Sequence, residues 1–338
     1  MSLHEPFMQR ALALARRGEG LTRPNPPVGA VLVQNGKIVA EGFHKKAGGP
    51  HAEANCLRQV EGQKSKSLKS ATLYVSLEPC STTGRTPPCT DLILERGIRH
   101  VVVGAKDPNP AHAGRGIRIL RRAGVEVITG VCRAEAEMLI APFAKRILTG
   151  MPYVTLKLAS TLDGRIADAS GKSKWITGSQ ARAKVQELRR SADAIMVGAG
   201  TVRADDPSLL PRPAKNRMPW RIIVGSDIPA TSRVLTDEAA ERTLVMSGSL
   251  KTILRDLGNR GVMHVLCEGG GELAGSLVRA GLVDEFALFV APSLLGGDGF
   301  PMVGKNGWPL TKMPLLYFQA LEKCGKDVFI QALPFREK

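Results

Sequence analysis

The chain has 338 residues, of which 43% are hydrophobic and 23% charged, a composition that excludes a mainly disordered protein and leaves room for two globular domains. Its formal net charge of +16 is spread over both halves and favours anionic partners such as phosphates or nucleic acid. The apolar runs are far shorter than the roughly 18 residues of a membrane span. Because neither a signal peptide nor a disulfide framework is indicated, we expect a cytoplasmic protein without membrane attachment.

The first half alternates helices and strands. An amphipathic helix over residues 7–15 precedes two strands, Val28–Val33 and Lys37–Gly42, which flank Asn35-Gly36, a pair typical of a type I′ hairpin turn. Helices over 50–61, 90–96, 116–123 and 133–148 then alternate with strands over 71–77, 100–104 and 125–128. This order predicts an α/β/α sandwich over residues 1–149.

Breaker residues follow the last of these helices. Thr149-Gly150-Met151-Pro152 places the predicted domain boundary between residues 149 and 150. In the second domain, residues 150–338, we expect strands at 153–159, 194–197, 221–224, 243–246, 264–267 and 285–290, with helices at 180–190, 250–258 and 272–280. Gly-rich turns follow several of these strands, as in nucleotide-binding α/β sheets.

Residues suited to a metal gather in the first half. His51, Cys80 and Cys89 offer one imidazole and two thiolates, and three protein ligands leave the fourth zinc position open for water, as in catalytic zinc sites. Glu53 comes two residues after the histidine at a predicted helix start, where its carboxylate can shuttle protons instead of binding the metal. Zinc-activated water can attack a carbon that bears an amino group, so the pattern predicts a hydrolytic deaminase. Eight residues separate the cysteines, where deaminases of the P-C-x-x-C type have two.

Two other functions fit parts of this pattern. A deaminase of flipped nucleobases would use the basic surface to bind nucleic acid. However, only 4% of the residues are aromatic, which offers few stacking platforms, and the second domain would stay unexplained; we therefore expect no nucleic-acid partner. A purely structural zinc would make the chain a binding module. The presence of Glu53 beside an open coordination position argues against this alternative.

Further motifs surround the metal residues: Pro24-Asn25-Pro26-Pro27-Val28-Gly29, Gly48-Gly49-Pro50-His51-Ala52-Glu53-Ala54, Leu77-Glu78-Pro79-Cys80, Gly84-Arg85-Thr86-Pro87-Pro88-Cys89 and Asp107-Pro108-Asn109-Pro110. With these motifs the chain resembles, over nearly its full length, the bifunctional riboflavin-biosynthesis deaminase/reductase family. The resemblance implies a cytidine-deaminase-like domain followed by an NADPH-dependent domain of dihydrofolate-reductase-like fold. It also implies deamination of 2,5-diamino-6-(5-phosphoribosylamino)pyrimidin-4(3H)-one, reduction of the ribosyl group to ribityl, and a homo-oligomer.

The resemblance assigns residues in the first domain. His51, Cys80 and Cys89 fall on the zinc ligands and Glu53 on the proton shuttle. The positions near the phosphorylated pyrimidine substrate are Asn25, His44, Asp107 and Asn109. The family usually has a histidine after Cys80-Ser81, where this chain has Thr82, so we expect the local substrate contact to differ.

The second domain carries the cofactor assignments. Its motif segments are 157–165, 173–177, 198–207 and 268–276. The resemblance implies NADP contacts at Ala159, Trp175, Thr201, Asp205, Ser226, Gly270, Gly271, Glu272, Leu273, Ala274, Gly275 and Ser276. We expect the glycines to let backbone N–H groups approach a pyrophosphate at the start of the helix near Glu272. The family usually has aspartate where this chain has Gly225, so the edge of the cofactor site is expected to differ.

Substrate contacts in the second domain are implied at Ser173, Arg189, Leu209, Arg212 and Glu268. Arg189 and Arg212 suit the 5′-phosphate, because a guanidinium binds phosphate oxygens through two parallel hydrogen bonds. Lys157 and Asp205 are candidate acid–base groups for the reduction.

Overall fold

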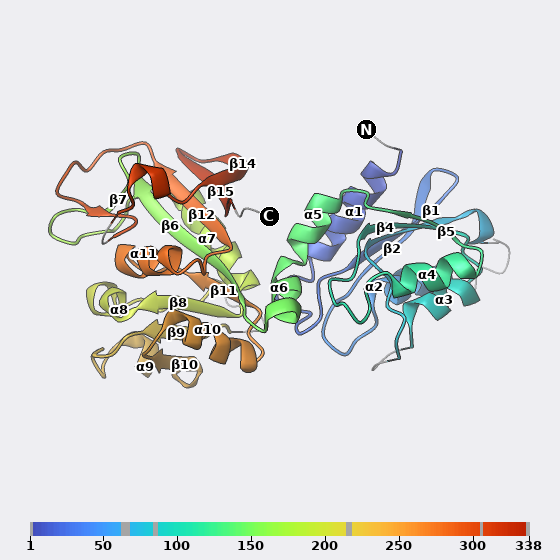
Figure 1. Ribbon diagram of the computed structural model, residues 1–338, viewed down its shortest axis with the longest axis horizontal. Coiled ribbons are helices and arrows are strands. Elements are labelled where there is room, and N and C mark those ends of the chain that lie inside the picture. Colours follow the sequence, from blue (N-terminus) through green and yellow to red (C-terminus); the bar gives the residue numbers. More distant parts are fainter. Residues whose placement is uncertain (1–2, 62–67, 84–86, 214–217, 305–306, 336–338) are drawn as a thin grey trace. The chain divides into compact units, whose positions relative to one another are not determined.

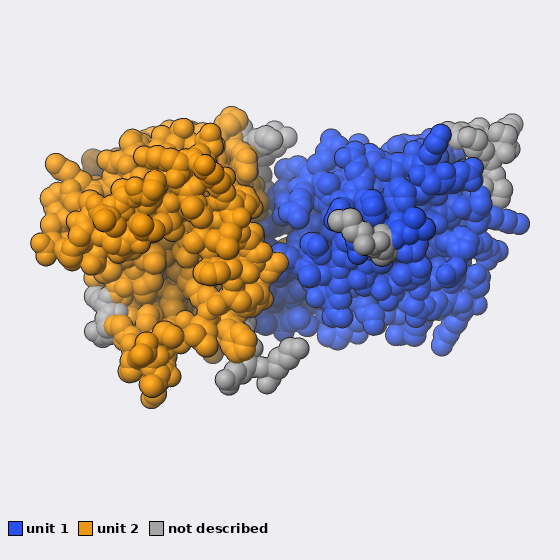
Figure 2. All heavy atoms as spheres, turned by 90° about the horizontal axis from the view of Figure 1, so that it is seen from above, with its two compact units in different colours: residues 1–150 blue, residues 151–338 orange. Residues whose placement is uncertain are grey.

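A computed structural model describes residues 3–61, 68–83, 87–213, 218–304 and 307–335 of the chain. The chain divides into two compact units, residues 1–150 and 151–338 (Figure 2). Each unit is built on a β-sheet with helices on both faces (Figure 1), so both are α/β, as predicted. Among the described residues, no helix is long and apolar enough to cross a membrane.

The sheet of the first unit has the strand order β2-β1-β3-β4-β5. The strands are β1 (Gly29–Gln34), β2 (Lys37–Phe43), β3 (Thr72–Leu77), β4 (His100–Ala105) and β5 (Glu126–Thr129). β1 is antiparallel to β2 and β3, whereas β3, β4 and β5 are parallel. Asn35 and Gly36 join β1 to β2 with φ values of 52° and 71°, and positive φ at both central residues is what a type I′ turn requires. The predicted hairpin is thus confirmed.

Helices cover both faces of this sheet. α1 (Glu5–Arg16) and α5 (Arg133–Leu139) pack on one face, and α2 (Ala52–Leu57), α3 (Cys89–Glu95) and α4 (Arg115–Arg122) pack on the other. Alternate residues of β1 serve the two layers: Val31 and Val33 join the core under α1, and Ala30 and Leu32 join the core under α2. The predicted sandwich is therefore present.

The single helix expected over residues 133–148 is wrong. α5 ends at Leu139, and α6 (Ala141–Thr149) starts two residues later. Pro142 lies in the first turn of α6. Proline has no N–H to donate and its ring clashes with the carbonyl one turn earlier, so it ends a helix that precedes it, although it is tolerated in the first turn of a new helix.

The main sheet of the second unit has the order β10-β9-β8-β11-β6-β12-β15-β14. Its strands are β6 (Tyr153–Thr161), β8 (Ala194–Gly198), β9 (Trp220–Val224), β10 (Thr243–Met246), β11 (His264–Cys267), β12 (Glu285–Ala291), β14 (Leu316–Cys324) and β15 (Asp327–Pro334). From β10 to β12 all neighbours are parallel, and β15 and β14 are added antiparallel. A small sheet pairs β7 (Arg165–Ala167) with β13 (Phe300–Pro301).

Two sets of helices sandwich the main sheet of the second unit. α10 (Leu250–Asn259) and α11 (Gly271–Arg279) contribute to the core on one face. α7 (Ser179–Ser191), α8 (Ala199–Asp205) and α9 (Arg233–Thr236) contribute to the cores on the other. In sheets of this kind, ligands bind outside the carboxyl ends of the parallel strands, which is where the predicted cofactor residues should lie.

Several elements of the second unit were not predicted. The sequence predicts no strand after residue 290 and a Gly-rich turn where α8 lies. The β14–β15 hairpin completes the sheet: Phe329 and Ala332 of β15 are buried, while Phe318 and Leu321 of the edge strand β14 are exposed. Apolar residues of β14 lie on both of its faces, so its sequence lacks the alternation of apolar and polar residues that would predict a strand.

Candidate functional site

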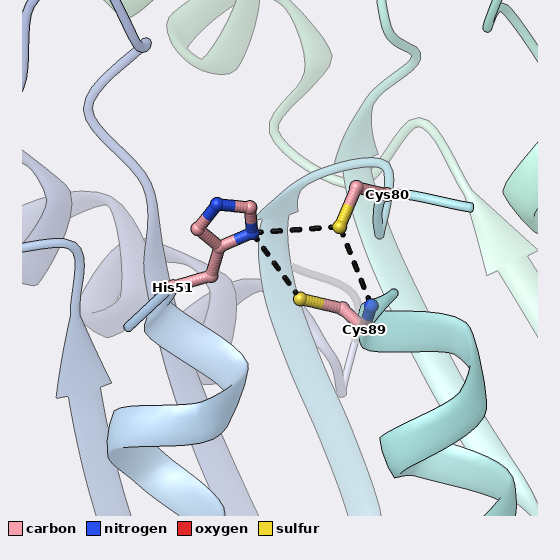
Figure 3. A group of neighbouring side chains, drawn as sticks. All are labelled: His51, Cys80 and Cys89. Atoms are coloured by element: carbon pink, nitrogen blue, oxygen red, sulfur yellow. Dashed lines mark hydrogen bonds between the residues drawn. The ribbon is translucent and has the colours of Figure 1, made fainter. Parts of the chain in front are cut away.

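Three ligand-type side chains meet at the starts of two helices in the first unit. His51 immediately precedes α2, Cys80 follows the end of β3, and Cys89 is the first residue of α3. The Nδ1 atom of His51 lies 3.4 Å from the Sγ atoms of both Cys80 and Cys89 (Figure 3). The three donor atoms all lie within 4.8 Å of one another, which confirms that the predicted cluster forms.

The donor set fits zinc. With Zn–N near 2.0 Å and Zn–S near 2.3 Å, two tetrahedral ligands of one zinc ion are separated by about 3.5 Å, which matches the distances from His51 to both sulfurs. The Cys89 backbone N–H also donates to Sγ of Cys80 at 3.3 Å. Hydrogen bonds from the Cys89 thiol and from His51 lower the pKa of the Cys80 thiol to about 4. A thiolate is therefore favoured here, as metal binding requires.

Glu53 is buried beside this cluster. It is the second residue of α2 and lies outside the set of three ligand atoms. Burial raises the pKa of Glu53 to about 7, and the neighbouring Cys80 thiolate contributes to the rise. A carboxyl group that titrates near neutral pH can both accept and donate a proton, which suits the predicted shuttle.

Asn25 and His44 form a hydrogen-bonded pair next to the metal cluster. Nδ1 of His44 lies 3.0 Å from the Pro50 carbonyl oxygen, and Nε2 of His44 lies 3.1 Å from Nδ2 of Asn25. The carbonyl can only accept, so Nδ1 donates and Nε2 accepts from the Asn25 amide. Burial lowers the pKa of His44, which favours this neutral form. The His44 and His51 rings are 5.3 Å apart edge to face, so two predicted substrate residues lie beside the metal ligands.

The Asp107 loop is held by a residue to which the sequence analysis gave no role. The carboxylate of Glu78 accepts backbone N–H groups from Asp107 and Gly114 on one oxygen, and from Gly116 and Ile117 on the other. Glu78 is buried two residues before Cys80. It therefore ties the metal-binding turn to the loop that carries Asp107. The motif Leu77-Glu78-Pro79-Cys80 was the available signal.

Asp107 and Asn109 stabilise their own loop. Oδ1 of Asp107 accepts the Asn109 N–H at 2.8 Å, and Oδ1 of Asn109 accepts the Ala111 N–H at 3.1 Å. Burial raises the pKa of Asp107.

The motif residues Gly84, Arg85 and Thr86 lie outside the described residues. A pocket between α2 and α3 reaches His51 and Cys89, and its lining includes Pro50, Leu57 and Leu92.

In the second unit, the predicted residues lie at the carboxyl ends of neighbouring strands. β9, β8, β11 and β6 are adjacent and parallel, with Val224 level with Gly198 and Met196 level with Cys267. The segments that carry Ser226, Thr201 and Glu268 therefore leave the sheet at the same end, Thr201 on α8 and the other two in the connections after β9 and β11.

The Gly-rich turn before α11 corrects our interpretation of its glycines. A Cβ atom on Gly271 would lie 2.3 Å from the Pro301 carbonyl oxygen, and one on Gly275 would lie 2.2 Å from the Gly304 carbonyl oxygen. These two glycines thus admit the protein's own backbone and need no pyrophosphate to explain them. Leu273 and Ala274 have side chains in the hydrophobic core. Only backbone groups of these residues can reach a ligand.

Gly270 and Gly198 are different. The nearest atom to a Cβ on Gly270 is the Thr201 hydroxyl oxygen at 3.7 Å, and the nearest to a Cβ on Gly198 is the Leu273 Cβ at 4.0 Å. Both glycines precede helices, α11 and α8, at neighbouring strand ends. A side chain at either position would make only ordinary van der Waals contacts, so the protein's own packing does not explain these two glycines, whereas close approach of a phosphate group to the backbone would.

Arg189 and Glu268 form an ion pair whose side chains are only 13% and 8% exposed. Nε of Arg189 donates to Oε1 of Glu268 at 2.6 Å and Nη2 donates to Oε2 at 3.0 Å, while Nη1 donates to the Leu210 carbonyl at 3.2 Å. Glu268 therefore already occupies the two-pronged face of the guanidinium with which the sequence analysis expects Arg189 to bind a phosphate. Lys157 is partly buried near this pair; burial lowers its pKa, and the Glu268 charge opposes that effect.

Of the other predicted residues in the second unit, Asp205 and Ser173 lie close together, and the rest lie at separate positions. Asp205 lies 3.5 Å from both the Ser173 hydroxyl and the Lys174 ammonium nitrogen. Trp175 is 72% exposed with the Arg182 guanidinium over its ring. Ala159 lies on β6, Leu209 is buried, and Arg212 is exposed.

The fold and the His51/Cys80/Cys89 cluster place the first unit among the zinc-binding deaminases, and the second unit is a separate α/β domain with a mainly parallel sheet. Residues 1–105 match the family model of the cytidine and deoxycytidylate deaminase zinc-binding region, and residues 152–330 match the RibD C-terminal domain. The riboflavin biosynthesis protein RibD of Escherichia coli is 42% identical, with 96% of this chain and 97% of that protein covered, and that of Bacillus amyloliquefaciens is 41% identical, with 98% and 96% covered.

A solved structure from Thermotoga maritima is 38% identical with a TM-score of 0.90, covering 98% of this chain and 99% of that one. That protein is a diaminohydroxyphosphoribosylaminopyrimidine deaminase/5-amino-6-(5-phosphoribosylamino)uracil reductase. The chain therefore belongs to the RibD family of bifunctional deaminase/reductase enzymes of riboflavin biosynthesis, which confirms the resemblance.

Proposed function

We propose that the first unit hydrolyses the 2-amino group of 2,5-diamino-6-(5-phosphoribosylamino)pyrimidin-4(3H)-one. The convergence of His51, Cys80 and Cys89 beside the buried Glu53 carries this proposal. These three residues would hold zinc, which lowers the pKa of water towards neutrality and so supplies a hydroxide nucleophile. Water adds to C2 and makes this carbon tetrahedral; the bond from C2 to the amino nitrogen then breaks, and the products are a carbonyl group and ammonia.

Glu53 would move the protons of this reaction. It takes one proton as water adds to C2 and delivers it to the departing nitrogen, which must be protonated to leave as ammonia. The raised pKa of about 7 lets the same carboxyl group do both near neutral pH. Asn25, His44, Asp107 and Asn109 would hold the pyrimidine and its ribosyl phosphate.

We propose that the second unit then reduces the deaminated compound. NADPH, when bound, supplies a hydride to C1′ of the ribosylamino group. The C1′–O4′ bond breaks, O4′ takes a proton, and the open ribityl chain results. Gly198 and Gly270, which no close contact within the protein explains, support a pyrophosphate site at the start of α11.

The remaining cofactor contacts proposed are Ala159, Trp175, Thr201, Asp205, Ser226 and the backbone of Gly271, Glu272, Leu273, Ala274, Gly275 and Ser276. Ser173, Leu209 and Glu268 would contact the substrate. Because Glu268 already occupies the two-pronged face of Arg189, we assign the larger share of 5′-phosphate binding to the exposed Arg212. Lys157 and Asp205 remain the proposed acid–base groups.

We also propose a homo-oligomer that uses β14. The register places Phe318, Leu321 and Val328 on one face of the β14–β15 hairpin, and they are 64%, 61% and 41% exposed. An exposed apolar face at a sheet edge is typical of an association surface. Sedimentation should show an oligomer that Phe318→Lys with Leu321→Glu converts to a monomer; a monomeric wild type would contradict this.

The reduced thiols of the metal cluster suit the cytoplasm, the compartment we propose.

The deaminase role of Glu53 is tested by comparing wild type with Glu53→Ala. Both receive the diaminopyrimidinone ribosyl phosphate with NADPH, and NADPH absorbance is followed. Wild type should consume NADPH, whereas the variant should consume it only when supplied with the already deaminated compound. A wild type that never oxidises NADPH, or a variant that still deaminates, would overturn the proposed roles.

A further inference from the structure

Asn55 joins the two segments that carry the histidines of the site in the first unit. It is a partly buried residue of α2, and its Nδ2 atom donates to the carbonyl oxygens of Phe43 at 2.9 Å and Pro50 at 3.1 Å. Phe43 is the last residue of β2, and Pro50 lies in the loop before α2. Each carbonyl therefore belongs to the residue immediately before one of the two histidines, His44 and His51.

The orientation of the Asn55 amide follows from its partners. Both partners are carbonyl oxygens, which only accept, so the NH2 group must face them and both of its N–H bonds are used. The Pro50 carbonyl also accepts the Nδ1–H of His44 at 3.0 Å, so both of its lone pairs are engaged. Asn55 thus belongs to the same hydrogen-bond network as the His44 ring, whose other nitrogen faces Asn25.

Close packing of β2 against α2 makes this bridge possible. A Cβ atom on Gly42 would lie 2.4 Å from both the Ala52 carbonyl oxygen and the Cys56 backbone nitrogen, which is too close for any side chain. The glycine therefore lets the end of β2 approach the backbone of the helix. At this separation the short side chain of Asn55 reaches from the helix to the strand.

The two hydrogen bonds hold the peptide groups from which both histidines extend. A carbonyl oxygen lies in the same rigid plane as the nitrogen of the next residue. Holding the oxygens of Phe43 and Pro50 therefore restricts the backbone at His44 and at His51. The two rings stand 5.3 Å apart, edge to face; one belongs to the metal cluster, and the other is proposed to hold the pyrimidine.

We propose that Asn55 is a positioning residue of the deaminase, which sets the spacing between the zinc ligand His51 and the substrate residue His44. The inference rests on the proposed function, in that zinc binds at His51 and the pyrimidine at His44. Loss of the amide frees both peptide groups at once, so zinc binding and substrate binding should weaken together.

Gln59 supplies a matched control for this role. It lies in the short helix η1 (Arg58–Val60) that continues α2, and its amide exchanges hydrogen bonds with the backbone of Glu41 on β2. It also donates to the Asn55 backbone carbonyl oxygen at 3.0 Å. Its bridge therefore joins the same strand to the same helical segment without touching the peptide groups beside the histidines.

Zinc affinity of the full chain gives the first readout. Wild type, Asn55→Leu and Gln59→Met compete for zinc with a chromophoric chelator, and each substitution removes the amide while keeping a side chain of similar shape. Groups that orient metal ligands contribute about 10–100-fold to metal affinity. We therefore expect Asn55→Leu to bind zinc at least about tenfold more weakly and Gln59→Met to match wild type. Asn55→Gln, which keeps both donors on a longer stem, should recover part of the loss.

Deamination at saturating zinc gives the second readout. We expect Asn55→Leu to raise the KM for the diaminopyrimidinone ribosyl phosphate at least about tenfold, because His44 is no longer held in line with the substrate. A fold that was merely less stable would lower the apparent kcat through loss of active enzyme and leave KM unchanged. Reduction of the deaminated compound by the same samples is the internal standard.

Several results would overturn this role of Asn55. They are an unchanged zinc affinity or an unchanged KM in Asn55→Leu, and equal losses in Asn55→Leu and Gln59→Met. If wild type binds zinc and does not deaminate this compound, the proposed function fails, and the zinc titration alone decides whether Asn55 positions His51. If wild type binds no zinc, the proposed function and the inference both fail.

Discussion

Glu78 should control both the stability of the Asp107 loop and the deaminase. In Glu78→Gln, one carboxylate oxygen becomes an amide nitrogen that cannot accept, so two of the four backbone hydrogen bonds are lost. Hydrogen bonds to a charged group are worth about 1.5–3 kcal/mol each, so the variant should lose at least about 3 kcal/mol locally. This corresponds to at least about 100-fold faster opening of the segment.

Amide hydrogen exchange is the suitable assay, because all tryptophans of the chain lie in the second unit and would not report on the first. Exchange at Gly114, Gly116 and Ile117 should accelerate by that factor in Glu78→Gln, and deaminase activity should fall while reductase activity is kept. Glu126→Gln on β5, an exposed residue that pairs with His100, is the control. Exchange of the Glu78 variant at the wild-type rate would refute the reasoning.

Three further changes follow from the geometry. Removal of the metal with a chelator should abolish deamination and leave reduction of the deaminated compound intact, with zinc restoring the first step; loss of both activities would contradict separate sites. Gly271→Ala should destabilise the second unit by about 1–3 kcal/mol, because its Cβ would lie 2.3 Å from the Pro301 oxygen, whereas Gly297→Ala, with no atom within 4 Å, should not; tryptophan fluorescence during urea unfolding compares them. Burial alone would raise the pKa of Glu268, but Arg189 and Lys157 lower it overall. The ionised pair therefore adds stability above the ordinary pKa of 4.5, and this is lost as the pH falls through the lowered value. Glu268→Gln should cost about 3–5 kcal/mol at neutral pH and flatten that acid dependence, and an unchanged acid profile would speak against the pair.

The metal site could be predicted from the sequence because its chemistry is local. His51 and Glu53 are two residues apart at a helix start, and Cys89 begins a helix nine residues after Cys80, so residue type and spacing indicate the cluster. The β1–β2 hairpin was equally predictable, since Asn35-Gly36 encodes its turn conformation locally.

The parts that could not be predicted depend on contacts between distant segments. Arg189 and Glu268 are far apart in the chain, and only the fold shows that they pair. The sequence around Gly271 is typical of a phosphate-binding turn, yet the group that lies against this glycine in the structure is the Pro301 carbonyl, 30 residues later in the chain. The hydrogen bonds that the Glu78 carboxylate accepts from backbone N–H groups 29 to 39 positions later are likewise set by the sheet and not by any local pattern.

The most direct test of the account measures both products of one substrate. Wild type is incubated with the diaminopyrimidinone ribosyl phosphate and NADPH, and ammonia, NADP⁺ and the pyrimidine species are quantified over time. We predict equal final amounts of ammonia and NADP⁺, with the deaminated ribosyl compound appearing before the ribityl product. Formation of NADP⁺ ahead of ammonia, or of either one alone, would contradict the proposed order of deamination and reduction.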